Sequence, residues 1–187
     1  MSAQSLTVFA GPRLIVTGDR DVAISALREL AANGEQRSIL VFDDATGEQV
    51  DLDVREGSIP VAAPANEEPE PRRPGRPKLG VVAREVTLLP RHWEWLNAQP
   101  GGASVALRKL VEAARRDSVD TDRMRHSQEA AFRFMTAVAG NEAGFEEACR
   151  ALYAGDREKF DSQIASWPAD VAAYASRLAG DAFAKRA

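Results

Sequence analysis

The sequence has few of the features that mark a secreted or membrane-spanning protein. It contains one cysteine, Cys149, which excludes a disulfide framework and any site built from several cysteines. No uncharged stretch approaches the length of a membrane span, and residues 1–12 contain no Lys or Arg. We therefore expect neither a transmembrane helix nor a secretory signal, and a cytoplasmic protein without membrane contact is the simplest expectation.

The sequence also lacks the usual motifs of enzymes. There is no nucleophile elbow, no glycine-rich phosphate-binding loop and no metalloprotease helix. His92 and His126 have no second His or Cys at ligand spacing. The acidic residues of one N-terminal stretch lack the spacing of a calcium-binding loop, and we interpret them as solvated turn and strand residues: Asp43, Asp44, Glu48, Asp51 and Asp53. We predict no enzymatic activity, no metal and no cofactor.

What the chain does have is an uneven distribution of charge. Residues 1–71 hold five Arg and thirteen Asp or Glu, which gives a net charge of −8. Residues 72–116 hold ten Lys or Arg and three Glu, a net charge of +7, and residues 117–187 hold nine basic and twelve acidic residues, a net charge of −3. A basic segment inside an acidic protein indicates an anionic partner for that segment.

The N-terminal part, residues 1–59, predicts a small α+β domain of the order ββαββ. Short β-branched runs flank the turn pair Gly11-Pro12, and a later run alternates apolar and charged residues as a half-buried strand does. Between these runs, Asp19 is a candidate helix cap. The expected strands cover residues 6–9, 14–16, 39–42 and 50–54, and the expected helix carries Ile24, Leu27, Leu30 and Ala31 on one face.

The rest of the chain divides into a linker, a basic segment and a helical region. Residues 60–80 are rich in Pro, Glu and Arg without any apolar period, which predicts an extended linker. Residues 118–187 are rich in Ala and predict a bundle of short helices, the first beginning near Thr121. Together with the N-terminal domain, this pattern predicts an α+β protein with separate domains at its two ends.

Residues 81–117, which hold most of the basic stretch beyond the linker, have the order of a β-branched strand, a two-turn helix, a Pro-Gly-Gly break and a longer amphipathic helix. Leu89-Pro90 marks the passage from strand to helix, and Gly101-Gly102 marks the turn. This order resembles the ribbon-helix-helix fold of Arc- and MetJ-type repressors. One short strand and two short helices cannot bury their apolar residues alone, so pairing with a second copy of the chain is expected.

The resemblance implies a homodimer that binds DNA. Residues 82–89 of two copies would form a ribbon that enters the major groove, with Glu85 and Thr87 facing the bases. The amide groups at the start of the second helix would hold a phosphate. The residues implied by this comparison are Arg84, Glu85, Thr87, Arg91, Gly102, Ala103, Ser104, Arg108 and Lys109.

The linker adds a second candidate for DNA contact. The run from Arg72 to Lys78 resembles an AT-hook, in which a Gly-Arg-Pro core lies in the narrow minor groove of A·T-rich DNA. Narrow grooves concentrate negative potential, which attracts Arg. The candidate residues are Arg72, Arg73, Arg76 and Lys78.

Several runs along the whole chain are similar to the bacterial domain-of-unknown-function family 2239. They are residues 75–80, 84–96, 99–111, 154–157 and 167–171. This similarity implies a bacterial protein. From the residues we predict a DNA-binding transcriptional regulator, and the alternative is an interaction scaffold that uses the same segment only to dimerise. Glu85 favours the alternative, because repressors of this type usually place Arg, Lys, Asn or Gln on the outward face of the strand.

Overall fold

The computed structural model describes residues 4–53, 82 and 84–184, which fall into two compact units. The larger unit comprises residues 4–53 together with 118–184, and the central unit comprises residues 82 and 84–117. The protein has mixed α and β structure and is mostly helical. No helix in the described ranges is both long enough and apolar enough to cross a membrane.

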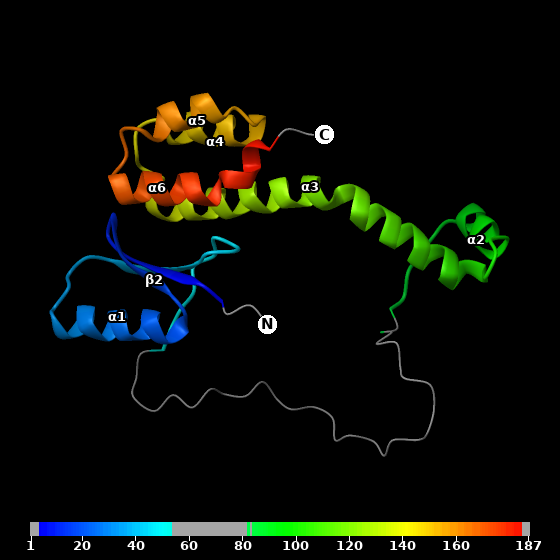
Figure 1. Ribbon diagram of the computed structural model, residues 1–187, viewed down its shortest axis with the longest axis horizontal. Helices are drawn as coiled ribbons and strands as arrows, with labels where there is room; N and C mark the ends of the chain where they lie inside the picture. The colour runs from blue at the N-terminus through cyan, green and yellow to red at the C-terminus, as the bar shows by residue number, and fades with distance from the viewer. Residues whose placement is uncertain (1–3, 54–81, 83, 185–187) are drawn as a thin grey trace, which may run out of the picture. The chain divides into compact units, whose positions relative to one another are not determined.

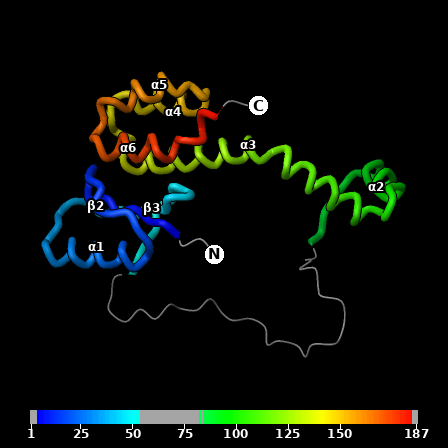
Figure 2. The backbone as a smooth tube through the Cα atoms, viewed as in Figure 1, coloured from blue at the N-terminus to red at the C-terminus, as the bar shows by residue number. Residues whose placement is uncertain are grey.

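The larger unit begins with a three-stranded antiparallel sheet of the order β2-β1-β3 (Figures 1 and 2). The strands are β1 (Leu6–Ala10), β2 (Arg13–Gly18) and β3 (Ile39–Asp43). Val8 of the central strand lies opposite Val16 on one side and Val41 on the other. These three strands and the turn at Gly11 confirm the sequence prediction.

The predicted fourth strand is not formed in the part of residues 50–54 that the structure describes. One isolated bridge joins Phe42 to Gln49, and the Val50 amide donates to the Val41 carbonyl at 2.8 Å. Beyond this hydrogen bond the chain leaves β3, although Leu52 remains buried. The alternation of apolar residues therefore predicted the burial of Leu52 correctly. It did not predict that the segment would lack a continuous ladder of backbone hydrogen bonds.

Two cores lie on the two faces of this sheet. Leu6, Val8 and Val41 pack against α1 (Arg20–Ala32), whose first turn is capped by the Asp19 carboxylate. Phe9 and Phe42 belong to a second, larger core that includes residues of the C-terminal helices. The N-terminal and C-terminal segments, which the sequence suggested as separate domains, therefore share a core and form one unit.

The C-terminal region forms short helices, as its sequence predicted. They are α4 (Phe145–Ala154), α5 (Arg157–Ile164) and α6 (Ala169–Leu178), followed by the short 3₁₀ helix η1 (Gly180–Phe183). Gly155 ends α4 with a φ of 72°, and the Asp156 carboxylate accepts from the Lys159 amide to cap α5. Gly in the left-handed region and Asp at an N-cap are the residues that these positions favour.

The helix expected from about Thr121 is instead the second half of a longer one. Helix α3 runs without a break over Gly102–Val138, a length of 37 residues. The sequence from Arg116 to Thr121 contains polar residues that often cap helices, but neither Gly nor Pro. Residues of this kind can also occupy the interior of a helix, and they mark a boundary only where the backbone departs from helical geometry. Without Gly or Pro to cause such a departure, they do not interrupt α3.

Gly47 allows the loop after β3 to approach α3 closely. Its φ is 66°, and a Cβ atom at this position would lie 2.1 Å from the Ala130 carbonyl oxygen. We predict that Gly47→Ala lowers the free energy of unfolding by about 2–4 kcal/mol, because it adds steric overlap to an unfavourable backbone conformation.

Gly34→Ala is the matched control, because Gly34 has nearly the same φ, 68°, and no atom within 4 Å of the added carbon. It isolates the backbone effect, which we expect to be about 1 kcal/mol. Urea unfolding followed by circular dichroism measures both variants. Equal losses in the two variants would contradict the proposed close approach to Ala130.

Candidate nucleic-acid interface

The central unit begins with an extended segment whose apolar side chains are uncovered. Residues 84–89 form no strand with the other described residues. Val86 and Leu89 are 53% and 49% exposed. The predicted base-facing residues Glu85 and Thr87, and their neighbour Arg84, are exposed as well. In one copy of the chain, Leu88 is partly buried and the other residues of this segment are exposed.

Helix α2 (Pro90–Asn97) follows, with Pro90 in its first turn and Leu96 as its one buried residue. The backbone then turns sharply: the Gln99 amide donates to the Leu96 carbonyl, and the Gly102 amide donates to the Gln99 carbonyl at 2.9 Å. Gly101 and Gly102 have φ values of 89° and 75°. These positive φ values explain why the Pro-Gly-Gly sequence separates α2 from α3.

The start of α3 brings four predicted site residues together. Gly102, Ala103 and Ser104 form its first turn, which contains no acidic residue. The Arg108 side chain folds back along the helix, with Nε donating to the Ser104 carbonyl at 3.1 Å and Nη2 to the Ser104 hydroxyl at 3.3 Å. Amide groups of a first helical turn, a hydroxyl and a guanidinium are the groups that bind an oxyanion such as phosphate.

Most cations of the central unit are not neutralised by the carboxylates that the structure describes. Arg115 forms an ion pair with Glu112 at 3.0 Å. Five others form no ion pair with a described carboxylate: Arg84, Arg91, Arg108, Lys109 and Arg116. In the larger unit, by contrast, eight cations form ion pairs: Arg37, Arg123, Arg125, Arg133, Arg150, Arg157, Lys159 and Arg177.

The central unit also lacks a core of its own. Its described residues include two buried apolar side chains, Leu96 and Ala106, and contribute to neither core cluster. Ten large apolar side chains are exposed among the described residues, and six of them belong to this unit: Val82, Val86, Leu89, Trp95, Leu110 and Val111. A unit of this size with so little burial is not expected to be stable without a partner.

The remaining predicted site residues are not gathered by contacts. Arg84, Arg91 and Lys109 are exposed and lie on the extended segment, α2 and α3, respectively. The four residues of the AT-hook-like run, Arg72, Arg73, Arg76 and Lys78, lie outside the described residues. The ribbon-helix-helix resemblance therefore stays a prediction, although the turn and the start of the second helix are where it placed them.

The larger unit contains a polar cluster that the sequence did not predict. Asp44, predicted to be a solvated turn residue, has a side chain that is 11% exposed, and Asp43 is buried. Burial raises the pKa of the Asp44 carboxyl, but the hydrogen bonds that it accepts outweigh this effect and hold the pKa below its usual value. Among its donors are the Tyr174 hydroxyl at 2.7 Å and Arg177 Nη2 at 2.8 Å. No local sequence signal connects residues 130 positions apart.

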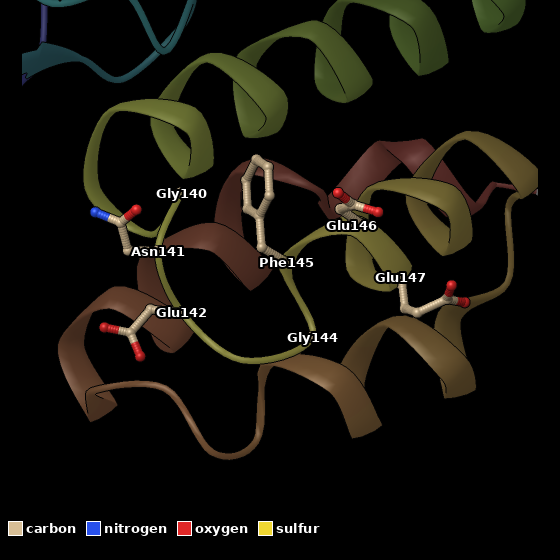
Figure 3. A pocket seen from close by; sticks show the side chains of 7 residues that line it. All are labelled: Gly140, Asn141, Glu142, Gly144, Phe145, Glu146 and Glu147. Atoms are coloured by element: carbon tan, nitrogen blue, oxygen red, sulfur yellow. The ribbon is translucent and has the colours of Figure 1, made fainter.

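A pocket of about 530 Å³ lies beside the loop between α3 and α4 (Figure 3). Figure 3 shows the carboxyl groups of Glu142 and Glu147 spread apart instead of converging. Glu147 forms an ion pair with Lys159 at 3.0 Å, and Glu146 with Arg150 at 3.5 Å. No group of three or more His, Cys, Asp or Glu in the described ranges is placed to hold a metal ion. An acidic pocket does not favour phosphate, so it lies outside the candidate interface.

The model of domain-of-unknown-function family 2239, described as an uncharacterized protein conserved in bacteria, matches residues 5–179. The chain belongs to this family. This match confirms the similarity noted from the sequence and covers nearly the whole chain. No curated protein matches the chain, and no solved structure matches it. Family membership names no ligand, so the functional conclusion rests on the residues of the interface.

Proposed function

We propose that this family 2239 protein is a homodimeric, cytoplasmic DNA-binding protein that regulates transcription. The observation that carries the proposal is the positive charge of the central unit, where five of the six described cations form no ion pair with a described carboxylate. Unpaired cations concentrated in one unit of an acidic protein supply the sequence-independent part of DNA affinity.

The contacts at the start of α3 support a specific mode of phosphate binding. The first-turn amides of Ala103 and Ser104, with the Ser104 hydroxyl and the Arg108 guanidinium, would hold one backbone phosphate. Arg84, Arg91 and Lys109 would contact neighbouring phosphates, and the ribbon of residues 82–89 would enter the major groove. The arm with Arg72, Arg73, Arg76 and Lys78 would reach the adjacent minor groove.

The uncovered apolar side chains support pairing with a second copy of the chain. Leu107, Leu110, Val111 and Ala114 lie on one face of α3 by their i, i+3, i+4, i+7 spacing, and no charged residue interrupts this face. In its second half the same helix buries Ala131, Phe134 and Met135 completely. A two-fold dimer would cover the first-half face and the extended segment together, because each copy offers the other the same surface.

The proposed dimer predicts a site-specific loss of self-association. Leu110→Glu and Val111→Glu, singly and together, should weaken dimerisation at least tenfold, because they place a charge in an apolar interface. Val119→Glu is the matched control, since Val119 is similarly exposed on the same helix but lies about a third of a turn from the face. Sedimentation velocity over a concentration series measures the effect. A dimer unaffected by Leu110→Glu, Val111→Glu and the double variant would contradict the proposed interface.

A gel-shift titration of the purified protein against random and A·T-rich duplexes tests DNA binding itself. We expect binding to both duplexes at 50 mM salt, with affinity falling as salt increases. A protein that does not bind, or whose affinity does not change with salt, would leave the scaffold alternative, in which the central unit only dimerises. Two observations favour that alternative as the second candidate: exposed Glu85 in the extended segment, and the large exposed apolar surface.

A further inference from the structure

Helix α2 presents one of its two tryptophan side chains to solvent. Trp95 is 53% exposed, while its neighbour Leu96 is 3% exposed and supplies the buried side of the helix. Trp93, on the same side as Leu96, is partly buried. A tryptophan is the side chain with the most apolar surface to gain from burial, so an outward Trp on a helix with its own buried face indicates a partner for the ring.

The residues around Trp95 indicate the chemistry of that partner. Arg91 lies one turn before Trp95, so the two share a face of α2. Gln99, in the turn that follows α2, donates its side-chain amide to the backbone carbonyl of Trp95 at 3.1 Å, and its side-chain oxygen remains an acceptor. Arg91 has no ion pair with a described carboxylate. Glu94 lies about 60° from Arg91 and about 100° from Trp95 around the helix.

We propose that Trp95 stacks on an unpaired base of single-stranded nucleic acid while Arg91 contacts the adjacent phosphate. This inference rests on the proposed function in one respect, namely that the central unit binds nucleic acid. Charge complementarity identifies the partner: the segment of residues 72–116 has a net charge of +7, and the ring adds a flat apolar surface. Bases in a duplex are stacked on one another and offer no open face to an indole, whereas bases of a single strand do.

The test compares a 12-nucleotide oligo(dT) with a 12-base-pair duplex on the full-length protein. Trp95→Ala should weaken oligo(dT) binding about tenfold or more, as loss of one stacked base does, and should change duplex binding less than twofold. Trp95→Phe should restore most of the affinity. Oligo(dT) should quench tryptophan emission in the wild type, and this quenching should disappear in Trp95→Phe. Tyr153→Ala, which removes an equally exposed aromatic ring from the larger unit, should bind as the wild type does.

Several results would overturn the inference. They are a wild type that does not bind oligo(dT), an oligo(dT) affinity unchanged in Trp95→Ala, and equal losses for oligo(dT) and duplex, which would assign Trp95 to an interface between copies. The failure of the proposed function gives a different pattern. A protein that binds oligo(dT) through Trp95 but not duplex DNA would refute the duplex-binding regulator and keep the inference. A protein that binds duplex DNA, but whose oligo(dT) affinity is unchanged in Trp95→Ala, would do the opposite.

Discussion

Replacing Asp44 with alanine is expected to lower the free energy of unfolding by about 3–5 kcal/mol. The Asp44 carboxylate accepts from four side chains: Ser5 Oγ at 2.5 Å, Thr7 Oγ1 at 2.7 Å, the Tyr174 hydroxyl at 2.7 Å and Arg177 Nη2 at 2.8 Å. Tyr174 is buried, so its hydroxyl would lose its acceptor where water cannot easily replace it. The cluster joins the sheet to α6, and its loss would separate two parts of one core.

The measurement is urea unfolding at pH 7, with two variants for comparison. Asp44→Asn keeps one oxygen acceptor but loses the charge, so it should fall between the wild type and Asp44→Ala. Asp51→Ala removes an exposed carboxylate a few residues away and should change stability by less than about 0.5 kcal/mol. If Asp44→Ala and Asp51→Ala were equally stable, the cluster would not contribute to the stability of the larger unit.

The Asp44 cluster also predicts how stability depends on pH. Its hydrogen bonds hold the folded-state pKa below the value of about 3.9 in an unfolded chain, so between the two values the unfolded state binds more protons. The contribution of Asp44 is therefore present above about pH 4 and is lost as the pH falls through the folded-state pKa. Urea midpoints between pH 2 and pH 6 should fall more steeply in the wild type than in Asp44→Asn. Parallel curves would contradict this sign.

Local patterns in the sequence predicted most of the elements but not their packing. The turn at Gly11 and the helix cap at Asp19 follow from backbone chemistry within a few residues, and the structure confirms both of them. The contact between Phe9 and Tyr174, whose ring centroids lie 5.3 Å apart, joins residues far apart in the sequence. An apolar period says that a face is buried without saying what covers it, so the shared core was predicted as two domains.

In the candidate interface, too, the sequence predicted local features but not which surfaces are covered. The spacing of Ser104 and Arg108 is that of one helical turn, so their contact is a local consequence of starting a helix at Gly102. The length of α3 was underestimated because the polar residues before Met124, Thr121 among them, resemble the start of a new helix. The exposure of Val86, Leu110 and Val111 could not be predicted, because an apolar residue in a sequence does not reveal whether its own chain or a partner covers it.

The second large effect is expected in the salt dependence of duplex binding. The logarithm of the binding constant should fall with the logarithm of salt concentration with a slope of magnitude about 4 or more, which corresponds to a loss of about 250-fold or more between 50 and 200 mM. Replacing Arg72, Arg73 and Arg76 together by alanine should reduce this magnitude by about 2–3. Arg91→Ala/Lys109→Ala should reduce it by about 2, because neither cation forms an ion pair with a described carboxylate.

The double variant Arg123→Ala/Arg125→Ala provides the control that separates local contacts from total charge. It removes two positive charges from the part of α3 that belongs to the larger unit, as many as Arg91→Ala/Lys109→Ala removes from the central unit. In the wild type, however, Arg123 and Arg125 form ion pairs with Asp120 and Asp122 at 3.7 and 3.2 Å. A cation already paired with a carboxylate neutralises little phosphate charge and so displaces few counterions from the DNA, so the slope should stay within about half a unit of the wild type. Equal changes in both double variants would mean that DNA responds to net charge alone, and the interface would lose its assignment to the central unit.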